Sequence, residues 1–145
     1  MLPSRKPTAD KLRLAWKATV PDHVVGVAWS PDSRHVAVAA VSGPVTIFNS
    51  NGKPVHQFAG HGFGTAAIAW QPGGSLLASA GQDGKVRLWD ATTGSEAKAL
   101  DGGAAWVEQL AWSPGGHLLA ASSGKKVRVW DAFGNLVREL PPQAG

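Results

Sequence analysis

A repeat of about 41 residues runs along the chain and constrains its fold more than any other feature. Trp-x-Pro tripeptides begin at Trp29, Trp70 and Trp112, at intervals of 41 and 42 residues. A second series joins an apolar residue, an aromatic residue and Asn or Asp. Its aromatic members are Phe48, Trp89 and Trp130, at intervals of 41 and 41 residues. Two marker series in one phase indicate three copies of one structural unit.

Each copy has the pattern of four short strands separated by turns. In the second copy, residues 65–70, 76–80 and 86–90 are apolar runs of strand length, and a weaker strand is expected near 96–100. Asp83-Gly84 lies between two of these runs, which is a strong hairpin signal. The sequence therefore predicts an all-β chain of four-stranded antiparallel sheets.

The repeat resembles that of the WD-repeat β-propeller family over about residues 12–140. The resemblance rests on the period, the four short strands, Gly60-His61 and Trp89-Asp90. The second copy is the nearest match. The first copy has Phe48-Asn49 where Trp-Asp is usual, and the third has Gly102-Gly103 where Gly-His is usual. The resemblance implies three four-stranded WD-type blades in this chain.

The second copy also holds His61, Ser79, Asp83 and Trp89. In the resembling family these positions form a structural hydrogen-bond network, and their donors and acceptors suit that role. A catalytic set of Ser, His and Asp is the alternative, but the strand–turn–helix context of a nucleophile elbow is absent around Ser79. The equivalents of Ser79 are Val38 in the first copy and Ala121 in the third.

Three blades do not close a ring, since propellers typically have about 4–8. An open arc would leave one sheet face bare at each end, so we expect the ring to be completed by oligomerisation. Two copies give six blades, which favours a dimer over a trimer. Residues 12–19 are expected to be an N-terminal closing strand, although Leu136–Glu139 already offer a fourth strand to the third blade. The two strands would compete, and which one closes the ring is left open.

The predicted organisation divides the chain into five parts. These are a basic leader over residues 1–11, a closing strand over 12–19, and blades over 20–60, 61–102 and 103–142.

Composition excludes several kinds of site. The chain has no Cys, which rules out disulfides, a thiolate metal site and a cysteine nucleophile. The five His residues lack metal-ligand spacing, and the glycine-rich loops are followed by strands instead of helices. We therefore predict no enzyme activity, no cofactor and no metal.

The net charge of +4 is concentrated at the N-terminus, in Arg5, Lys6, Lys11, Arg13 and Lys17. Salt-dependent binding of nucleic acid by this arm is a minor alternative to a solvated leader. No apolar run is long enough to span a bilayer and no signal peptide is recognisable, so a cytoplasmic protein without membrane contact is expected.

These features predict a non-enzymatic scaffold that self-assembles into a propeller and mediates protein–protein interaction. The alternative is an engineered or evolutionary fragment of a larger propeller whose only activity is self-association. In the resembling family, the loops before the first strands and between the second and third strands share one face. The candidate partner-binding residues in these loops are His23, Phe63, Gln82, Trp106 and Lys125. The identity of a partner other than a second copy is left open.

Overall fold

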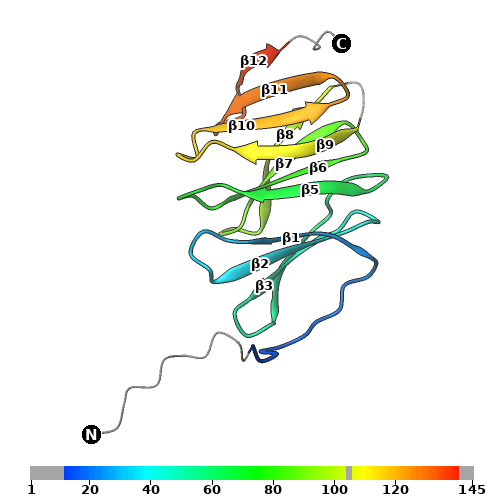
Figure 1. The fold of residues 1–145 in the computed structure, drawn as a ribbon, viewed down its shortest axis with the longest axis vertical. Coiled ribbons are helices and arrows are strands. Elements are labelled where there is room, and N and C mark those ends of the chain that lie inside the picture. Colours follow the sequence, from blue (N-terminus) through cyan, green and yellow to red (C-terminus); the bar gives the residue numbers. More distant parts are fainter. Residues whose placement is uncertain (1–11, 104–105, 141–145) are drawn as a thin grey trace, which may run out of the picture.

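The computed structural model of the protein describes residues 12–103 and 106–140. Within these ranges it contains twelve strands and no helix, arranged as three antiparallel sheets of four strands each (Figure 1). The expected all-β architecture is thereby confirmed, whereas closure into a ring stays a prediction.

The first sheet comprises β1 (Val24–Trp29), β2 (His35–Ala40), β3 (Val45–Asn49) and β4 (Pro54–Phe58). The second comprises β5 (Thr65–Trp70), β6 (Leu76–Gly81), β7 (Lys85–Asp90) and β8 (Ser95–Asp101). The third comprises β9 (Val107–Trp112), β10 (Leu118–Ser123), β11 (Lys126–Asp131) and β12 (Leu136–Leu140).

Strand order within each sheet follows the chain, because short turns connect each strand to its neighbour. The β6–β7 hairpin shows how the sequence encodes such a turn. The Asp83 carboxylate accepts the backbone N–H of Lys85 at 3.0 Å, and Gly84 has a φ of 76°. A side chain at that φ would be strained, so the Asp-Gly pair sets this turn.

The three sheets stack face to face, with the second between the other two (Figure 1). One buried cluster joins the first and second sheets and includes Ala37, Ile47, Phe58, Leu77 and Trp89. Another joins the second and third sheets and includes Ala78, Val86, Leu100, Leu119 and Trp130. The core therefore consists of two layers between sheets, and burial of these apolar side chains holds the stack together.

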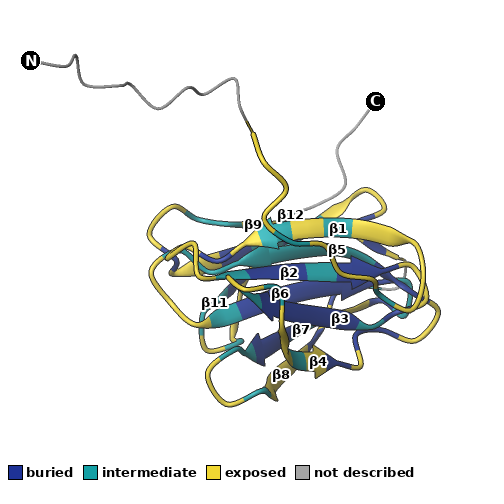
Figure 2. Cartoon of the chain, turned by 90° about the horizontal axis from the view of Figure 1, so that it is seen from below, coloured by how far each residue is buried: buried dark blue, intermediate teal, exposed yellow. Residues whose placement is uncertain are grey.

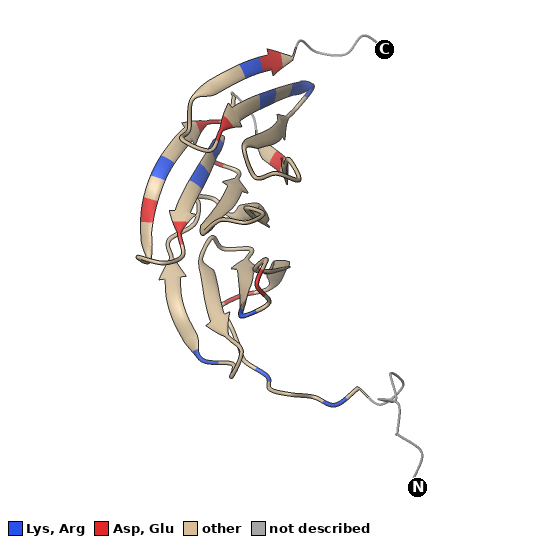
Figure 3. Ribbon diagram, turned by 90° about the vertical axis from the view of Figure 1, so that its left-hand side faces the viewer, with Lys and Arg blue, Asp and Glu red and all other residues tan. Residues whose placement is uncertain are grey.

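The stack curves into an arc (Figure 3), and the third and fourth strands of the second and third sheets carry most of the charged residues found in strands. The first strands of the sheets lie beside one another, since β1 contacts β5 and β5 contacts β9. Strands β1 and β5 have no charged residue and β9 has only Glu108, whereas β8 and β12 each carry both signs. Charged side chains are thus concentrated away from the first and second strands of the sheets.

The N-terminal segment departs from expectation. Residues 12–20 form no strand, although a closing strand was expected over residues 12–19. The edge of β11 that such a strand would need is already paired with β12, from Val127↔Leu140 to Trp130↔Leu136. The segment instead runs across the outer face of the first sheet (Figure 2). The basic leader over residues 1–11, with Arg5, Lys6 and Lys11, lies outside the described residues.

Candidate functional site

The second sheet brings His61, Ser79, Asp83 and Trp89 together. The loop before β5 supplies His61, β6 supplies Ser79, the β6–β7 turn supplies Asp83 and β7 supplies Trp89. The imidazole Nδ1 of His61 lies 2.9 Å from Asp83 Oδ1, and its Nε2 lies 2.7 Å from Ser79 Oγ. The indole Nε1 of Trp89 donates to the same Oγ at 2.7 Å. A continuous chain of three hydrogen bonds results.

The donors and acceptors fix where the protons lie. Indole can only donate, so Ser79 Oγ accepts from Trp89 and its own hydrogen points to His61 Nε2. The Nδ1–H of a neutral His61 then donates to the Asp83 carboxylate. Every group in the chain has a partner in this arrangement, which is what makes a buried polar network stable.

The environment of the network favours a neutral imidazole. Burial lowers the pKa of His61 below its usual value, and the hydrogen bond and charge of Asp83 offset this only in part. Burial acts to raise the pKa of Asp83, but hydrogen bonds from His61 and the Lys85 N–H outweigh it and lower that pKa overall. At neutral pH the pair is therefore an uncharged imidazole and a carboxylate.

This connectivity matches that of a nucleophile, base and orienting acid, but its surroundings do not fit catalysis. Ser79 has 0% of its surface exposed and Trp89 has 5%, so no substrate carbonyl could reach the hydroxyl oxygen. The donor Trp89 also occupies a lone pair of that oxygen. In the other sheets the register positions of Ser79 hold Val38 and Ala121, which cannot form such a network.

The candidate partner-binding residues lie in different loops. Phe63 is 88% exposed, with a φ of 69°, and Trp106 is 56% exposed. Gln82 is half-buried beside the loop of Phe63, where its backbone N–H donates to the Gly64 carbonyl. His23 and Lys125 are exposed. In the described ranges, no hydrogen bond or ring contact links His23, Trp106 and Lys125 to one another.

The contacts between sheets repeat along the stack, which the sequence analysis did not foresee. Trp70 of β5 donates its indole N–H to the Ala28 carbonyl of β1 at 2.9 Å. Trp112 of β9 donates in the same way to Ala69 of β5 at 3.1 Å. Trp29 holds the same place in β1, but no sheet of the described residues precedes it, and it is 59% exposed. The Trp-x-Pro recurrence signals this position, but a single sequence does not show which of its members is left uncovered.

One end of the stack is covered by the N-terminal segment. Trp16 lies against Phe48 with ring centroids 5.8 Å apart. It also lies over Gly52, where an added Cβ would come within 2.7 Å of the indole. The cover is incomplete, because a cavity of about 390 Å³ remains between residues 19–21 and β3. Phe48 is nonetheless buried.

At the other end of the stack, none of the described residues covers the outer face of the third sheet. Two shallow hollows of about 210 and 280 Å³ lie over β9, β10 and β11. They are lined mainly by small and apolar side chains, among them Ala111, Leu118, Ala120, Val127 and Val129. The equivalent residues of the second sheet, such as Ala78, Val86 and Leu88, are fully buried against the third sheet. The outer face of the third sheet is thus an unfilled packing surface.

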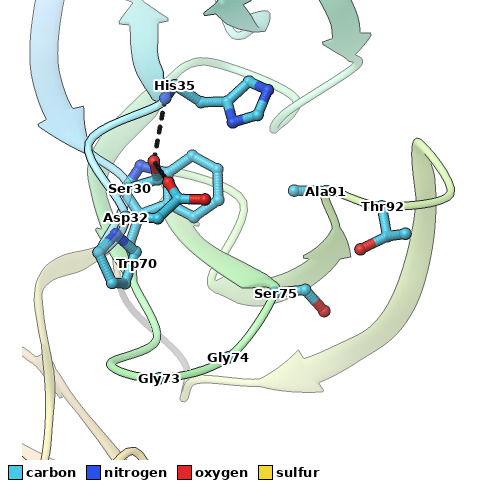
Figure 4. A pocket seen from close by; sticks show the side chains of 10 residues that line it. Ser30, Asp32, His35, Trp70, Gly73, Gly74, Ser75, Ala91 and Thr92 are labelled. Atoms are coloured by element: carbon cyan, nitrogen blue, oxygen red, sulfur yellow. Dashed lines mark hydrogen bonds between the residues drawn. The ribbon is translucent and has the colours of Figure 1, made fainter.

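A cleft of about 520 Å³ opens between the first and second sheets, at the edge opposite the β6–β7 turn (Figure 4). Ser30, Asp32 and His35 line one wall, and Gly73 and Thr92 lie across from them. Ser30 Oγ donates to Asp32 at 2.6 Å and accepts from the backbone N–H of His35 at 3.0 Å. These bonds organise the β1–β2 turn. Within the described part of the chain, no group of three or more His, Cys, Asp or Glu side chains could hold a metal.

Comparison with known families matches this architecture. The WD40 domain of anaphase-promoting complex subunit 4 matches residues 27–105, which is more than half of the chain. The chain belongs to the WD-repeat family. The WD domain, or G-beta repeat, also matches residues 94–131, across the junction of the second and third sheets. The three sheets are therefore WD-type blades.

Two proteins of Oryza sativa subsp. japonica are similar to this chain. Small ribosomal subunit protein RACK1y is 37% identical over 123 residues, which cover 81% of this chain and 36% of the relative. Small ribosomal subunit protein RACK1z is 33% identical over 85 residues, which cover 58% of this chain and 25% of the relative. This chain spans about a third and about a quarter of the lengths of these relatives. Among its described residues, no helix is long and apolar enough to cross a membrane.

Proposed function

We propose that this protein is a non-enzymatic WD-repeat scaffold that assembles with copies of itself and presents loops to protein partners. One observation carries the proposal: the sheets pack by a repeated set of contacts that is incomplete at both ends, since the N-terminal segment covers the first sheet only in part. Trp29 is exposed at one end, and the apolar face of β10 and β11 is uncovered at the other. Surfaces of this kind are typical of interaction sites.

The buried network supports a structural role over a catalytic one. A hydrolase would need Ser79 accessible and free to attack, whereas it is enclosed and bonded to Trp89. We therefore propose that His61, Ser79, Asp83 and Trp89 hold the β6–β7 turn against the loop before β5. In the assembled form β12, and not residues 12–19, supplies the outer strand of the third blade.

The loop residues are the proposed sites for other proteins. Phe63 and Trp106 offer exposed aromatic surface, which is enriched among residues that dominate binding energy. A partner that copurifies with the protein should be lost from the Phe63→Ala and Trp106→Ala variants and retained by Thr92→Ala, which alters an exposed residue away from these loops. Equal retention by all three variants would contradict this assignment.

Self-assembly is tested by the solution mass of the full chain, measured by light scattering over a wide concentration range. A mass of twice 15.0 kDa would support a ring of six blades. A chain that stays at 15.0 kDa at every concentration would contradict self-assembly and leave only the proposed loop function. A cytoplasmic location is also proposed, and cell fractionation would test it.

A further inference from the structure

The two internal junctions of the stack are built by one set of contacts. At each junction, a Trp of the following sheet donates to an Ala carbonyl of the preceding sheet. The pairs are Trp70 with Ala28 and Trp112 with Ala69. At each junction, an apolar residue of the preceding fourth strand also shares a buried cluster with an aromatic residue of the following third strand. These pairs are Phe58 with Trp89 and Leu100 with Trp130.

The residues for one more junction of this kind are present, but they lie at opposite ends of the stack. At the first sheet, Trp29 and Phe48 stand at the positions of Trp70 and Trp89. At the third sheet, Ala111 pairs with Ala120 as Ala28 pairs with Ala37. Leu140 pairs with Val127 as Phe58 pairs with Val45. The first sheet therefore offers the indole donor and the aromatic residue of a junction. The third sheet offers the matching Ala carbonyl and apolar residue, so the two ends are complementary.

We infer that a second copy of this chain docks head to tail, with its third sheet against the first sheet of its neighbour. The indole N–H of Trp29 in one copy donates to the Ala111 carbonyl of the other, and Leu140 of that other copy packs over Phe48. This inference rests on the proposed self-assembly and specifies its contact. Because the contact joins different surfaces, it closes only when the last copy meets the first, and two copies suffice for six blades.

The docking face on the third sheet has the chemistry that the junction needs. Its Ala120, Val127 and Val129 stand where Ala78, Val86 and Leu88 of the second sheet are buried by the third. In the isolated chain these three residues are half-exposed, and Leu118 is 39% exposed. Small and apolar side chains without charge match the uncharged strand β1 that would cover them.

The N-terminal segment competes for the same place. Trp16 now lies against Phe48, where Leu140 of a second copy would pack, and Thr19 to Pro21 lie over β3. This cover leaves a cavity of about 390 Å³, which a complementary sheet face would fill. The segment must therefore move off Phe48 before the second copy can dock. Replacing Trp16 by Ala should tighten association about tenfold, because it raises the fraction of chains in which Phe48 is accessible to a second copy.

Cysteine cross-linking tests the contact directly, because the chain has no cysteine of its own. At the first internal junction, an ideal Cβ on Gly26 lies 3.3 Å from Cγ1 of Ile68, which is within disulfide reach. The equivalent positions across the proposed contact are Gln109 and Val27. Both are exposed, so single substitutions there should not disturb folding.

We expect a mixture of Val27→Cys and Gln109→Cys chains to form a disulfide-linked dimer under mild oxidation. A mixture of Val27→Cys and Thr92→Cys should form at least about tenfold less, because Thr92 lies away from the contact. If the full chain associates but the two mixtures cross-link equally, this contact is wrong while the proposed self-assembly stands.

Sedimentation of single variants provides the second test. Trp16→Ala should lower the dimer dissociation constant about tenfold, and Trp29→Phe should raise it about tenfold by deleting one hydrogen-bond donor. An unchanged constant in Trp16→Ala would overturn the competition, and an unchanged constant in Trp29→Phe would overturn the Ala111 contact. If neither the unaltered chain nor Trp16→Ala associates, self-assembly itself fails, and the open faces belong to a different partner.

Discussion

The indole N–H of Trp89 donates to the Ser79 hydroxyl oxygen over 2.7 Å, and this bond links adjacent strands β6 and β7 within the buried interior. The same hydroxyl lies 2.7 Å from His61, so one side chain joins two strands to the loop before β5. Trp89 in turn stacks on Phe58 of the first sheet, with ring centroids 4.8 Å apart and an interplanar angle of 14°. The polar network and the apolar junction therefore share Trp89. A substitution that disturbs one of them should also destabilise the other.

Ser79→Ala should lower the free energy of unfolding by about 2 kcal/mol, because it leaves the Trp89 N–H and His61 Nε2 buried without partners. Urea unfolding followed by tryptophan fluorescence would measure the change. Ser75→Ala, at an exposed turn position, is the control and should change stability by less than about 0.5 kcal/mol. Equal effects of the two substitutions would show that the network contributes nothing to stability.

Acidification should destabilise the protein through His61. In the unfolded chain this imidazole takes up a proton near its ordinary pKa of 6.5, whereas burial lowers its pKa in the folded state. The unfolded state therefore binds more protons as the pH falls below about 6.5, and stability is lost by up to about 2 kcal/mol between pH 7 and pH 5. The contribution of Asp83, whose pKa is also lowered, is lost only below its ordinary value of 3.8.

The control for this pH effect is His61→Gln, which cannot titrate. It should be less stable than the unaltered chain at pH 7, yet lose less stability between pH 7 and pH 5. Urea titrations at both pH values would measure the difference. Parallel pH dependence in the two proteins would show that His61 is not the source of the effect.

Phe58→Ala should cost about 3–5 kcal/mol, because it opens a cavity against Trp89 between two sheets. Phe58→Leu should cost only about 1 kcal/mol, since Leu100 fills the same register position at the next junction. Thermal and urea unfolding would rank the variants. Phe63→Ala, which removes an 88% exposed ring, should have an effect below about 0.5 kcal/mol, and a larger loss there would contradict its placement.

Gly84→Ala should destabilise the chain by about 1–2 kcal/mol, because the β6–β7 turn holds this residue at a φ of 76°. Gly62→Ala provides the comparison. Gly62 is exposed, is not among the residues with positive φ, and an added Cβ there would meet nothing within 4 Å. We expect it to be neutral in the same unfolding assay. A neutral Gly84→Ala would mean that the turn relaxes to another conformation.

Much of this architecture follows from local sequence chemistry. The run from Thr65 to Trp70 was predicted as a strand and is β5 at the same residues. Asp83-Gly84 predicted a hairpin because a carboxylate that accepts backbone N–H groups and a residue free to adopt positive φ are what a tight turn needs. The other hairpins of the three sheets follow the same logic, because each turn is encoded next to the strands that it joins.

The contacts at the ends of the stack could not be read in this way. Residues 12–19 were predicted as a strand because they lie where a fourth strand would precede the first repeat, but a strand forms only where an edge is free to pair with it. Trp29, Trp70 and Trp112 share one sequence context, yet only Trp29 is 59% exposed, since its environment depends on which sheet lies beside it. Burial of this kind is a property of the assembled sheets and leaves no local signature.

The middle position of the second sheet also determines the order in which parts of the molecule unfold locally. Each sheet borders only its neighbours, so the energetics resemble a short linear array with nearest-neighbour coupling. The second sheet contributes to both buried layers, whereas β12 lies at an edge and most of its residues are exposed. Amide hydrogens should therefore exchange with solvent in order of position, β12 first and β6 last, and opening should progress inward from the third sheet instead of occurring in one step.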